Sequence, residues 1–384
     1  MQDLIGLADR GNRAALLAQV RLHPEATREA VHALLRRSVA GASSESVSGA
    51  AEGRVGDLSS PERLARAYFD VWTDPFLLQE VDRFKDWSEG NRRLKLAADS
   101  LRSTGNEAFQ TFGVQAALEL WRESLHHSLR AGDPAGEAKT RGNLGAGFYV
   151  GGEPDSARVY LTAAYEGATE IGDFRTASGA LTNLANLAFD EGRMSEAGDL
   201  FSQSISILSR TGENRHLSAA QHNLALVSMA LGDLVGAREA LEQSIELSRL
   251  HGYPGDESEG LSTLADLAQA EGEYAEAEQH LDLALILGRE AGSRVAEAGV
   301  LHSRGLLDLA RGAYPESKDH LAEAAEIYGR LDRGPDQVAA LQDLARAKVA
   351  MGDIRGGLSV LQEAEESAAS TELGALVEAD LALT

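Results

Sequence analysis

The sequence contains no cysteine, and this absence excludes disulfide bridges, zinc sites built on thiolates and catalytic thiols from this stretch of chain. Aromatic residues make up only 5%, so a core has to be built from the abundant Ala, Leu and Gly, which let helices approach closely. Long apolar runs are lacking, since no window approaches the roughly 18 residues of a membrane span. The N-terminus lacks the basic and then apolar pattern of a secretion signal. We therefore expect a cytoplasmic protein that is neither secreted nor inserted in a membrane.

Basic residues are scarce after residue 100. Residues 1–100 carry 15 acidic and 14 basic side chains, whereas residues 101–384 carry 45 and 22, so nearly all of the net charge of −24 lies in the second region. Phosphate backbones need Lys and Arg for binding, so nucleic acid is excluded as a partner of that region, and basic proteins or peptides are favoured. The alternative interpretation is a solvated acidic surface that keeps the protein soluble.

The sequence does contain a repeat of 40 residues, marked by small side chains. The first series is Gly105, Gly145, Ala185, Ala225, Ala265, Gly305 and Ala345. The second series, twelve residues later, is Ala117, Ala157, Ala197, Ala237, Ala277, Ser317 and Gly357. A glycine series lies between them, at Gly152, Gly192, Gly232, Gly272, Gly312 and Gly352. A fourth series, Gly132, Gly172, Gly212, Gly252 and Gly292 followed by Asp332, closes each unit.

Each series has a physical interpretation. The small residues let two paired helices touch, and the glycines adopt the positive φ that ends a helix. Five prolines, Pro134, Pro154, Pro254, Pro315 and Pro335, fall near expected helix starts, where a missing N–H costs little. The pattern predicts one helical hairpin per repeat.

The repeats resemble the tetratricopeptide family in Leu144-Gly145, in Ala117 with Trp121, and in Ala197 with Phe201. The resemblance covers roughly residues 92–384, although the period is longer than the usual one of about 34 residues and no proline ends the second helix. It implies an all-α, right-handed superhelical solenoid of about seven hairpins that binds a protein or peptide on its concave face.

The predicted domains are an N-terminal helical cap at 1–91, seven repeats at 92–371, and the first helix of a truncated eighth repeat at 372–384. Within the cap we expect two or three helices before residue 41, a flexible Ser-, Gly- and Ala-rich linker at 41–60, and two further helices. Six aromatic residues, Tyr68, Phe69, Trp72, Phe76, Phe84 and Trp87, are expected to seal the first repeat. A ligand pocket is the alternative interpretation of this cluster.

The segments WTDPFLLQEVDRFKDWS, LWRESL and GNLGAGFY are similar to the N-terminal repeat regions of bacterial proteins that end in a CHAT domain. That resemblance implies a caspase-like protease domain following in cis, and a regulatory or partner-sensing role for this chain. It transfers no catalytic residue. The apolar end of the sequence and the truncated eighth repeat likewise predict a longer polypeptide.

The concave face is the expected binding site, because the first helices of stacked hairpins line it. One ladder of polar residues follows the 40-residue step there, and further polar residues lie beside it. The candidate binding residues are Asn143, Asn183, Asn223, Asn186, His222, Asn106 and Asp266. Asn amides both donate and accept, which suits the main chain of an extended peptide. The alternative role of these Asn residues is to hydrogen-bond the backbone of a neighbouring helix and fix the stacking angle.

Catalytic and metal-binding patterns are lacking. The histidines show no H-E-x-x-H or comparable ligand spacing, so we predict no metal, no cofactor and no enzymatic activity. The expected function is a protein- or peptide-binding scaffold that forms the regulatory part of a CHAT-type protease or similar effector. The alternatives are a stand-alone intracellular peptide receptor and an enzyme that uses carboxylates or histidines in the concavity.

Overall fold

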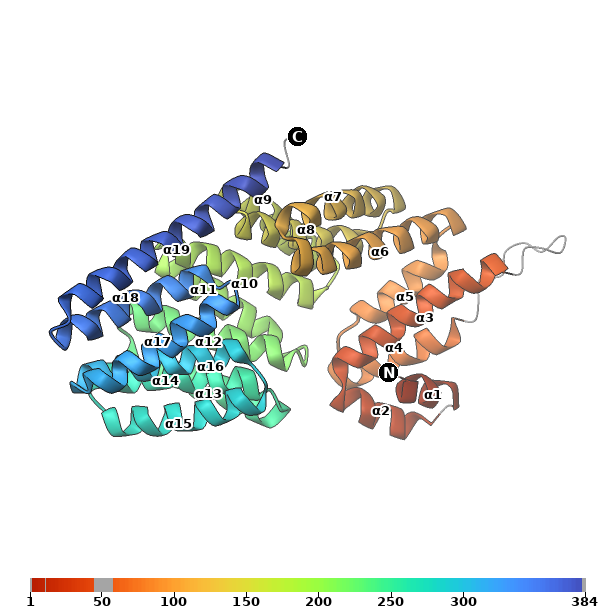
Figure 1. Ribbon diagram of the computed structural model, residues 1–384. Helices are drawn as coiled ribbons and strands as arrows, with labels where there is room; N and C mark the ends of the chain where they lie inside the picture. The colour runs from red at the N-terminus through yellow and green to blue at the C-terminus, as the bar shows by residue number, and fades with distance from the viewer. Residues whose placement is uncertain (1, 11, 45–57, 382–384) are drawn as a thin grey trace. The chain divides into compact units, whose positions relative to one another are not determined.

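The computed structural model describes residues 2–10, 12–44 and 58–381. In these residues all of the regular secondary structure is α-helical and comprises 19 helices (Figure 1), which confirms the predicted fold class. The chain divides into two compact units, Met1–His216 and Leu217–Thr384, and the boundary lies in α12 (Asn214–Leu231). None of the described helices is both long and apolar enough to cross a membrane.

The first five helices form a bundle with its own hydrophobic core. They are α1 (Gln2–Arg10), α2 (Arg13–Leu22), α3 (Pro24–Ser44), α4 (Ser59–Trp72) and α5 (Phe76–Asp86). The helix start at Pro24 and the break before Phe76 agree with the sequence prediction. Residues 41–44 and 59–60 of the predicted linker are helical, as the ends of α3 and α4, and most of the rest of it, 45–57, lies outside the described residues. Tyr68 and Phe84 are fully buried in the core of this bundle, so these two aromatic side chains hold the N-terminal helices together. Sealing of the first repeat by the aromatic segment stays a prediction.

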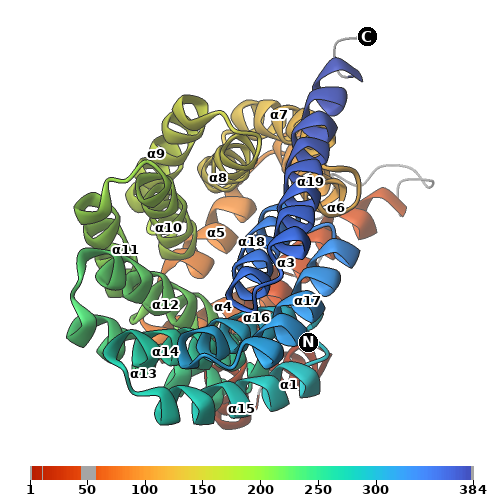
Figure 2. The same cartoon turned by 60° about the vertical axis from the view of Figure 1, so that its left-hand side comes forward.

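The remaining helices form seven consecutive antiparallel pairs. These are α6 (Glu89–Phe112) with α7 (Val114–Ala131), α8 (Pro134–Val150) with α9 (Pro154–Glu170), α10 (Phe174–Asp190) with α11 (Met194–Leu208), α12 with α13 (Leu234–His251), α14 (Pro254–Glu271) with α15 (Tyr274–Glu290), α16 (Arg294–Arg311) with α17 (Tyr314–Arg330), and α18 (Gly334–Ala350) with α19 (Ile354–Leu381). In the first unit, Figure 2 shows α8 and α10 on the inner side, towards α5, with α9 and α11 on the outer side.

The two small-residue series meet inside the hairpins, as the sequence predicts. A Cβ added to Gly145 on α8 would lie 2.6 Å from Cγ of Leu161 on α9, and Gly305 on α16 has the same relation to Leu321, at 2.5 Å. Ser317, from the second series, donates a hydrogen bond to the carbonyl oxygen of Gly305, from the first, at 2.7 Å. Small side chains at these positions therefore set the close approach of the paired helices.

The helix ends also follow the sequence. Every glycine of the two turn series has a positive φ, and Asp332, which replaces glycine in its series, is left-handed at φ 54°. All five prolines of the repeats lie in the first turn of a helix. Backbone conformation is thus determined locally at these boundaries.

The predicted start of a separate helix at residue 372 is wrong. Residues 354–381 form one continuous helix, α19, and residues 382–384 lie outside the described part of the chain. The physical reason is that position 372, one period after Asp332, is Glu372. It supplies no left-handed residue to end the helix.

Candidate functional site

The first unit contains a polar cleft between the N-terminal helices and the repeats. Its volume is about 410 Å³. One wall comes from α3 and α5, and the other from α6, α8, α10 and the segment that leads into α12. The repeat wall consists mainly of residues from first helices, which is the face that the sequence predicted for binding.

Three of the seven predicted residues line this cleft: Asn106, Asn143 and Asn183. Nδ2 of Asn143 donates to Oδ1 of Asn106 at 2.6 Å, and the same oxygen accepts from Nε1 of Trp121 at 3.0 Å. Asn106 and Asn143 therefore join α6 and α8 through their side chains, whereas the alternative considered from the sequence was a bond to the backbone of a neighbouring helix. Asn183 is half-buried on α10, and its side chain makes no hydrogen bond to any residue that the structure describes.

The other four predicted residues do not line the cleft. Asn186 lies one turn after Asn183 on α10, and its side chain is half-buried and has a partner. His222, Asn223 and Asp266 belong to the second unit, on α12 and α14. Burial lowers the pKa of His222, against the opposing effect of Glu259 and Asp256.

Cations of the cleft lining were missed by the sequence analysis. Arg102, Lys139 and Arg175 come from three successive first helices, and Arg28 comes from α3. Arg102 pairs with Asp99 at 2.9 Å. The Lys139 ammonium lies 5.0 Å from the centre of the Phe76 ring and makes no hydrogen bond within the described chain, although Glu80 and Asp173 lie 3.7 and 4.0 Å away. The three cations on first helices do not follow the 40-residue period of the sequence, so the repeat pattern gave no signal for them.

Beside the cleft lies a buried cluster around Glu80, whose side chain is 3% exposed. Its carboxylate contacts Nε2 of His32 at 2.8 Å, Nζ of Lys95 at 3.6 Å and Nζ of Lys139 at 3.7 Å. Burial would raise the pKa of Glu80, but Lys139, His32 and Lys95 outweigh it and hold the pKa well below its ordinary value. The carboxylate is therefore charged in the folded protein.

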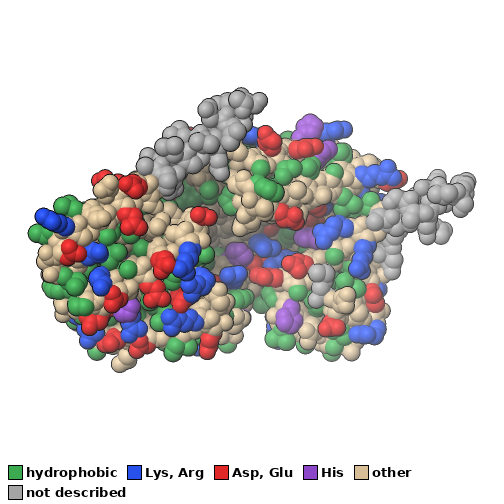
Figure 3. Space-filling model, viewed as in Figure 1, with side chains coloured by type: hydrophobic (Ala, Val, Ile, Leu, Met, Phe, Trp, Pro, Cys, Tyr) green, Lys and Arg blue, Asp and Glu red, His purple; other side chains and the backbone are tan. Residues whose placement is uncertain are grey.

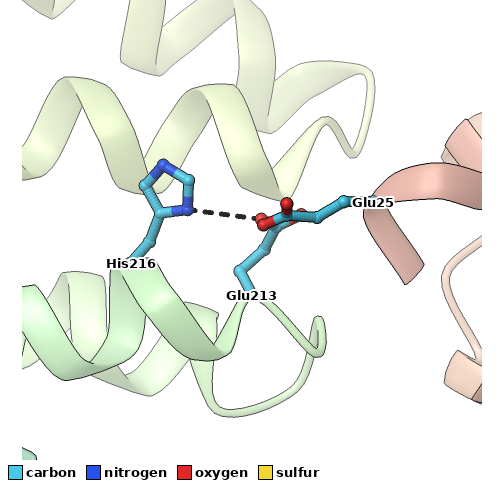
Figure 4. Close-up of side chains that lie close together, drawn as sticks. All are labelled: Glu25, Glu213 and His216. Carbon is cyan, nitrogen blue, oxygen red and sulfur yellow. Dashed lines mark ion pairs between the residues drawn. The ribbon is translucent and has the colours of Figure 1, made fainter. Parts of the chain in front are cut away.

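A second buried carboxylate, Glu213, lies between α11 and α12 (Figure 4). It pairs with Arg28, with Nε of Arg175 at 3.8 Å and with Nδ1 of His216 at 3.3 Å. Burial opposes its charge, but His216, Arg28 and Arg175 lower its pKa.

Glu25, Glu213 and His216 could place three ligand atoms within 4.8 Å of one another. Because Arg28 already neutralises Glu213, a divalent cation there would face a fixed positive charge. We therefore assign this cluster to ion pairing.

Charges of both signs are mixed on the displayed surface of the protein. In Figure 3, acidic and basic side chains are interspersed over the displayed face, without a broad region of one sign. The acidic excess of the sequence thus does not describe the cleft, whose lining has four Lys or Arg residues and two Asp residues, Asp74 and Asp173.

Asp266 anchors a polar contact in the second unit. Oγ of Ser303 donates to its Oδ2 at 3.2 Å, while on the next first helix His302 contacts Asp343 at 2.9 Å. Burial raises the pKa of Asp266 to about 6, against the lowering effects of Ser303 and His302. Asp266 thus releases its proton near pH 6 in the folded protein.

Asp266→Asn is expected to stabilise the second unit at pH 7. The raised pKa means that the folded state holds its proton more tightly, so the contribution of Asp266 to stability is lost as pH rises from about 4 to about 6. Relative to the original chain, the variant should gain about 1–3 kcal/mol between pH 4 and pH 7 in urea unfolding. A difference that does not change with pH would contradict the assignment.

Asp343→Asn is the matched control with the opposite sign. Burial opposes the charge of Asp343, but His302 and Arg346 lower its pKa. Its contribution is therefore present above its unfolded pKa, and the variant should be less stable than the original chain at pH 7. This deficit should shrink only as pH falls below about 4, through the folded-state pKa of Asp343.

Comparison with known proteins supports the repeat assignment. The family model described as tetratricopeptide repeat matches residues 176–250. No curated protein matches the sequence. The solved structures that are similar in fold include the following three.

Aspartyl phosphate phosphatase F from Bacillus subtilis has 12% identity and a TM-score of 0.61, over 89% of this chain and 92% of that chain. The apo form of RapI has 12% identity and a TM-score of 0.60, over 72% and 98%. A Rap protein complexed with competence and sporulation factor has 13% identity and a TM-score of 0.50, over 86% and 98%. At these identities the likeness concerns the fold, which is that of tetratricopeptide-like helical solenoids.

Proposed function

We propose that this chain is a scaffold that binds a protein or peptide segment in the cleft of its first unit. The observation that carries the proposal is the amide of Asn183, which lines the cleft and has no hydrogen-bond partner among the described residues. A half-buried amide of this kind can hydrogen-bond a bound segment, the guest, without breaking a hydrogen bond of the fold.

The side chains that line the cleft indicate which chemical groups a bound segment would carry. Asn183 can donate to and accept from a peptide unit, and Lys139 supplies an ammonium without a short hydrogen bond. The cleft, at about 410 Å³, falls within the size range of ligand sites. A short extended segment with at least one acidic group fits this lining better than the basic partner suggested by the net charge. Binding of competence and sporulation factor by a protein of similar fold adds support.

The place of this scaffold in the cell is a further part of the proposal. It acts in the cytoplasm as the regulatory, partner-sensing part of a larger protein, with an effector of the CHAT protease type in cis, and it performs no catalysis itself. The resemblance of WTDPFLLQEVDRFKDWS and GNLGAGFY to such proteins supports this view. The alternative is a stand-alone peptide receptor, which the same cleft would serve.

Asn183→Ala is expected to weaken guest binding without lowering the melting temperature. Loss of one hydrogen bond corresponds to an affinity decrease of about 3- to 10-fold. Peptides selected from a displayed random library would be titrated against the original chain and the variant. Asn143→Ala is the matched comparison, since it removes the bond to Asn106 and should lower the melting temperature. Unchanged affinity with a lowered melting temperature for Asn183→Ala would overturn the proposal.

A further inference from the structure

The N-terminal helices and the repeats keep separate hydrophobic cores. Every buried residue in the core of the bundle lies between Leu4 and Phe84. One core of the repeats is built from buried residues between Ala117 and Leu187. Each part therefore retains its own apolar packing if the contact between them opens.

Two buried carboxylates pair with cations across the contact between the two parts, one from the bundle and one from the repeats. Glu80, on α5 of the bundle, meets Lys95 of α6 at 3.6 Å and Lys139 of α8 at 3.7 Å. Glu213, from the repeats, pairs with Arg28 on α3 of the bundle. The side chains of Glu80, Glu213 and Lys95 are 3%, 0% and 5% exposed, so these charges depend on neighbouring charges rather than on water. Within its own part, Glu80 also contacts His32 at 2.8 Å, and Lys95 contacts Asp99 and Asp133 at 3.1 Å each.

Uncharged side chains of α4 also contact the residues next to Glu213. Oη of Tyr68 donates to the carbonyl oxygen of Thr211 at 3.4 Å. Gly212, with φ +69°, lies against the Trp72 ring so closely that an added Cβ would come within 2.7 Å of it. Residues 211–213 thus pack closely against the bundle.

We propose that the N-terminal helices are a releasable closure of the cleft, held on the repeats by a latch that consists of Glu80 with Lys95 and Lys139, and of Glu213 with Arg28. A buried ion pair adds little net stability but is costly to break by removing one partner, so such a contact is specific and yet reversible. Lys139 and Arg28 also line the cleft, so cleft and latch share these two cations. The consequence for guest access rests on the proposed function, whereas the latch itself does not.

The latch can be tested without any guest, because the chain contains no cysteine and accepts specific labels. Arg66→Cys on α4 and Thr169→Cys on α9 place spin labels at exposed positions on the bundle and on the repeats. Pulsed electron resonance then gives their distance distribution in the full chain. The labelled parent is compared with the same chain carrying Glu80→Gln and Glu213→Gln.

Glu297→Gln is the matched control. Glu297 is also a buried glutamate, 7% exposed, and it pairs with Arg289 and Arg294 inside the second unit. Circular dichroism checks that every variant keeps its helix content.

The parent and the Glu297→Gln control should give one narrow distance peak. The latch variant should give a distribution at least about twice as wide, with unchanged helix content, because the closure then moves relative to the repeats. A latch variant with the narrow peak of the parent, or a parent that is already broad, would overturn the proposal. If the latch variant loses helix content, a second variant that carries Arg28→Lys and Lys139→Gln is measured in its place. A wider distribution would again support the proposal, and the narrow peak of the parent would again overturn it. A negative result of the distance measurement would not bear on peptide binding in the cleft. A negative result of the peptide titration would not bear on the latch.

Discussion

Gly145→Leu should destabilise the folded first unit by about 2–3 kcal/mol, even though leucine is a better helix former than glycine. The added Cβ would lie 2.6 Å from Cγ and 2.8 Å from Cδ2 of Leu161, and 3.0 Å from the backbone nitrogen of that residue. A backbone atom cannot turn away, so α8 and α9 would have to separate. Thermal and urea unfolding of the full chain measure the loss.

Gly179→Leu is the matched control, because it makes the same substitution in the middle of another first helix. An added Cβ at Gly179 meets no atom within 4 Å outside its own helix. The control should therefore keep or raise stability, by about 0.5–1 kcal/mol, through helix propensity alone. If both variants lose stability equally, the small-residue series does not mark helix contact.

The hairpins were predictable because their causes are local. Gly152 and Gly272 end helices through a conformation that glycine adopts at no steric cost, and Pro154 starts the next helix without needing an N–H. Asp332 takes the left-handed conformation of the glycine that it replaces in the series. The same reasoning accounts for the error at residue 372, where continuation of the period was assumed although Glu372 lacks that property.

The cleft could be predicted only in part, because half of it comes from residues distant in sequence. The repeat period placed Asn143 and Asn183 on the inner face, and both line the cleft. No periodic pattern brings Arg28 of α3 to Glu213, because their pairing depends on how a separately cored bundle docks. Nor could spacing distinguish Asn143, which bonds Asn106, from Asn183, which bonds no described residue.

Gly179→Leu also carries the largest expected effect on guest binding. Gly179 lines the cleft between Thr176 and Asn183, and the space beyond its Cα is open. A leucine side chain there would occupy the volume that a guest needs beside the Asn183 amide. Since the added Cβ meets no atom of another helix, we expect the fold to keep its stability and the affinity for a selected peptide to fall at least about 10-fold, which corresponds to roughly 1.4 kcal/mol.

Gly179→Ala separates occlusion from a change in helix stability. Alanine raises helix propensity as leucine does, but it adds only one carbon to the lining. Its affinity for the same peptide should stay within about 3-fold of the parent, or roughly 0.7 kcal/mol.

The most direct test of the account is a fluorescence anisotropy titration of one selected peptide against the parent, Gly179→Ala and Gly179→Leu chains. Occupancy of the cleft predicts that the parent and the alanine variant bind alike, and that the leucine variant binds at least about 10-fold more weakly at an equal or higher melting temperature. Equal affinity for all three chains would mean that the guest binds elsewhere, and would contradict the assignment of this cleft as the binding site.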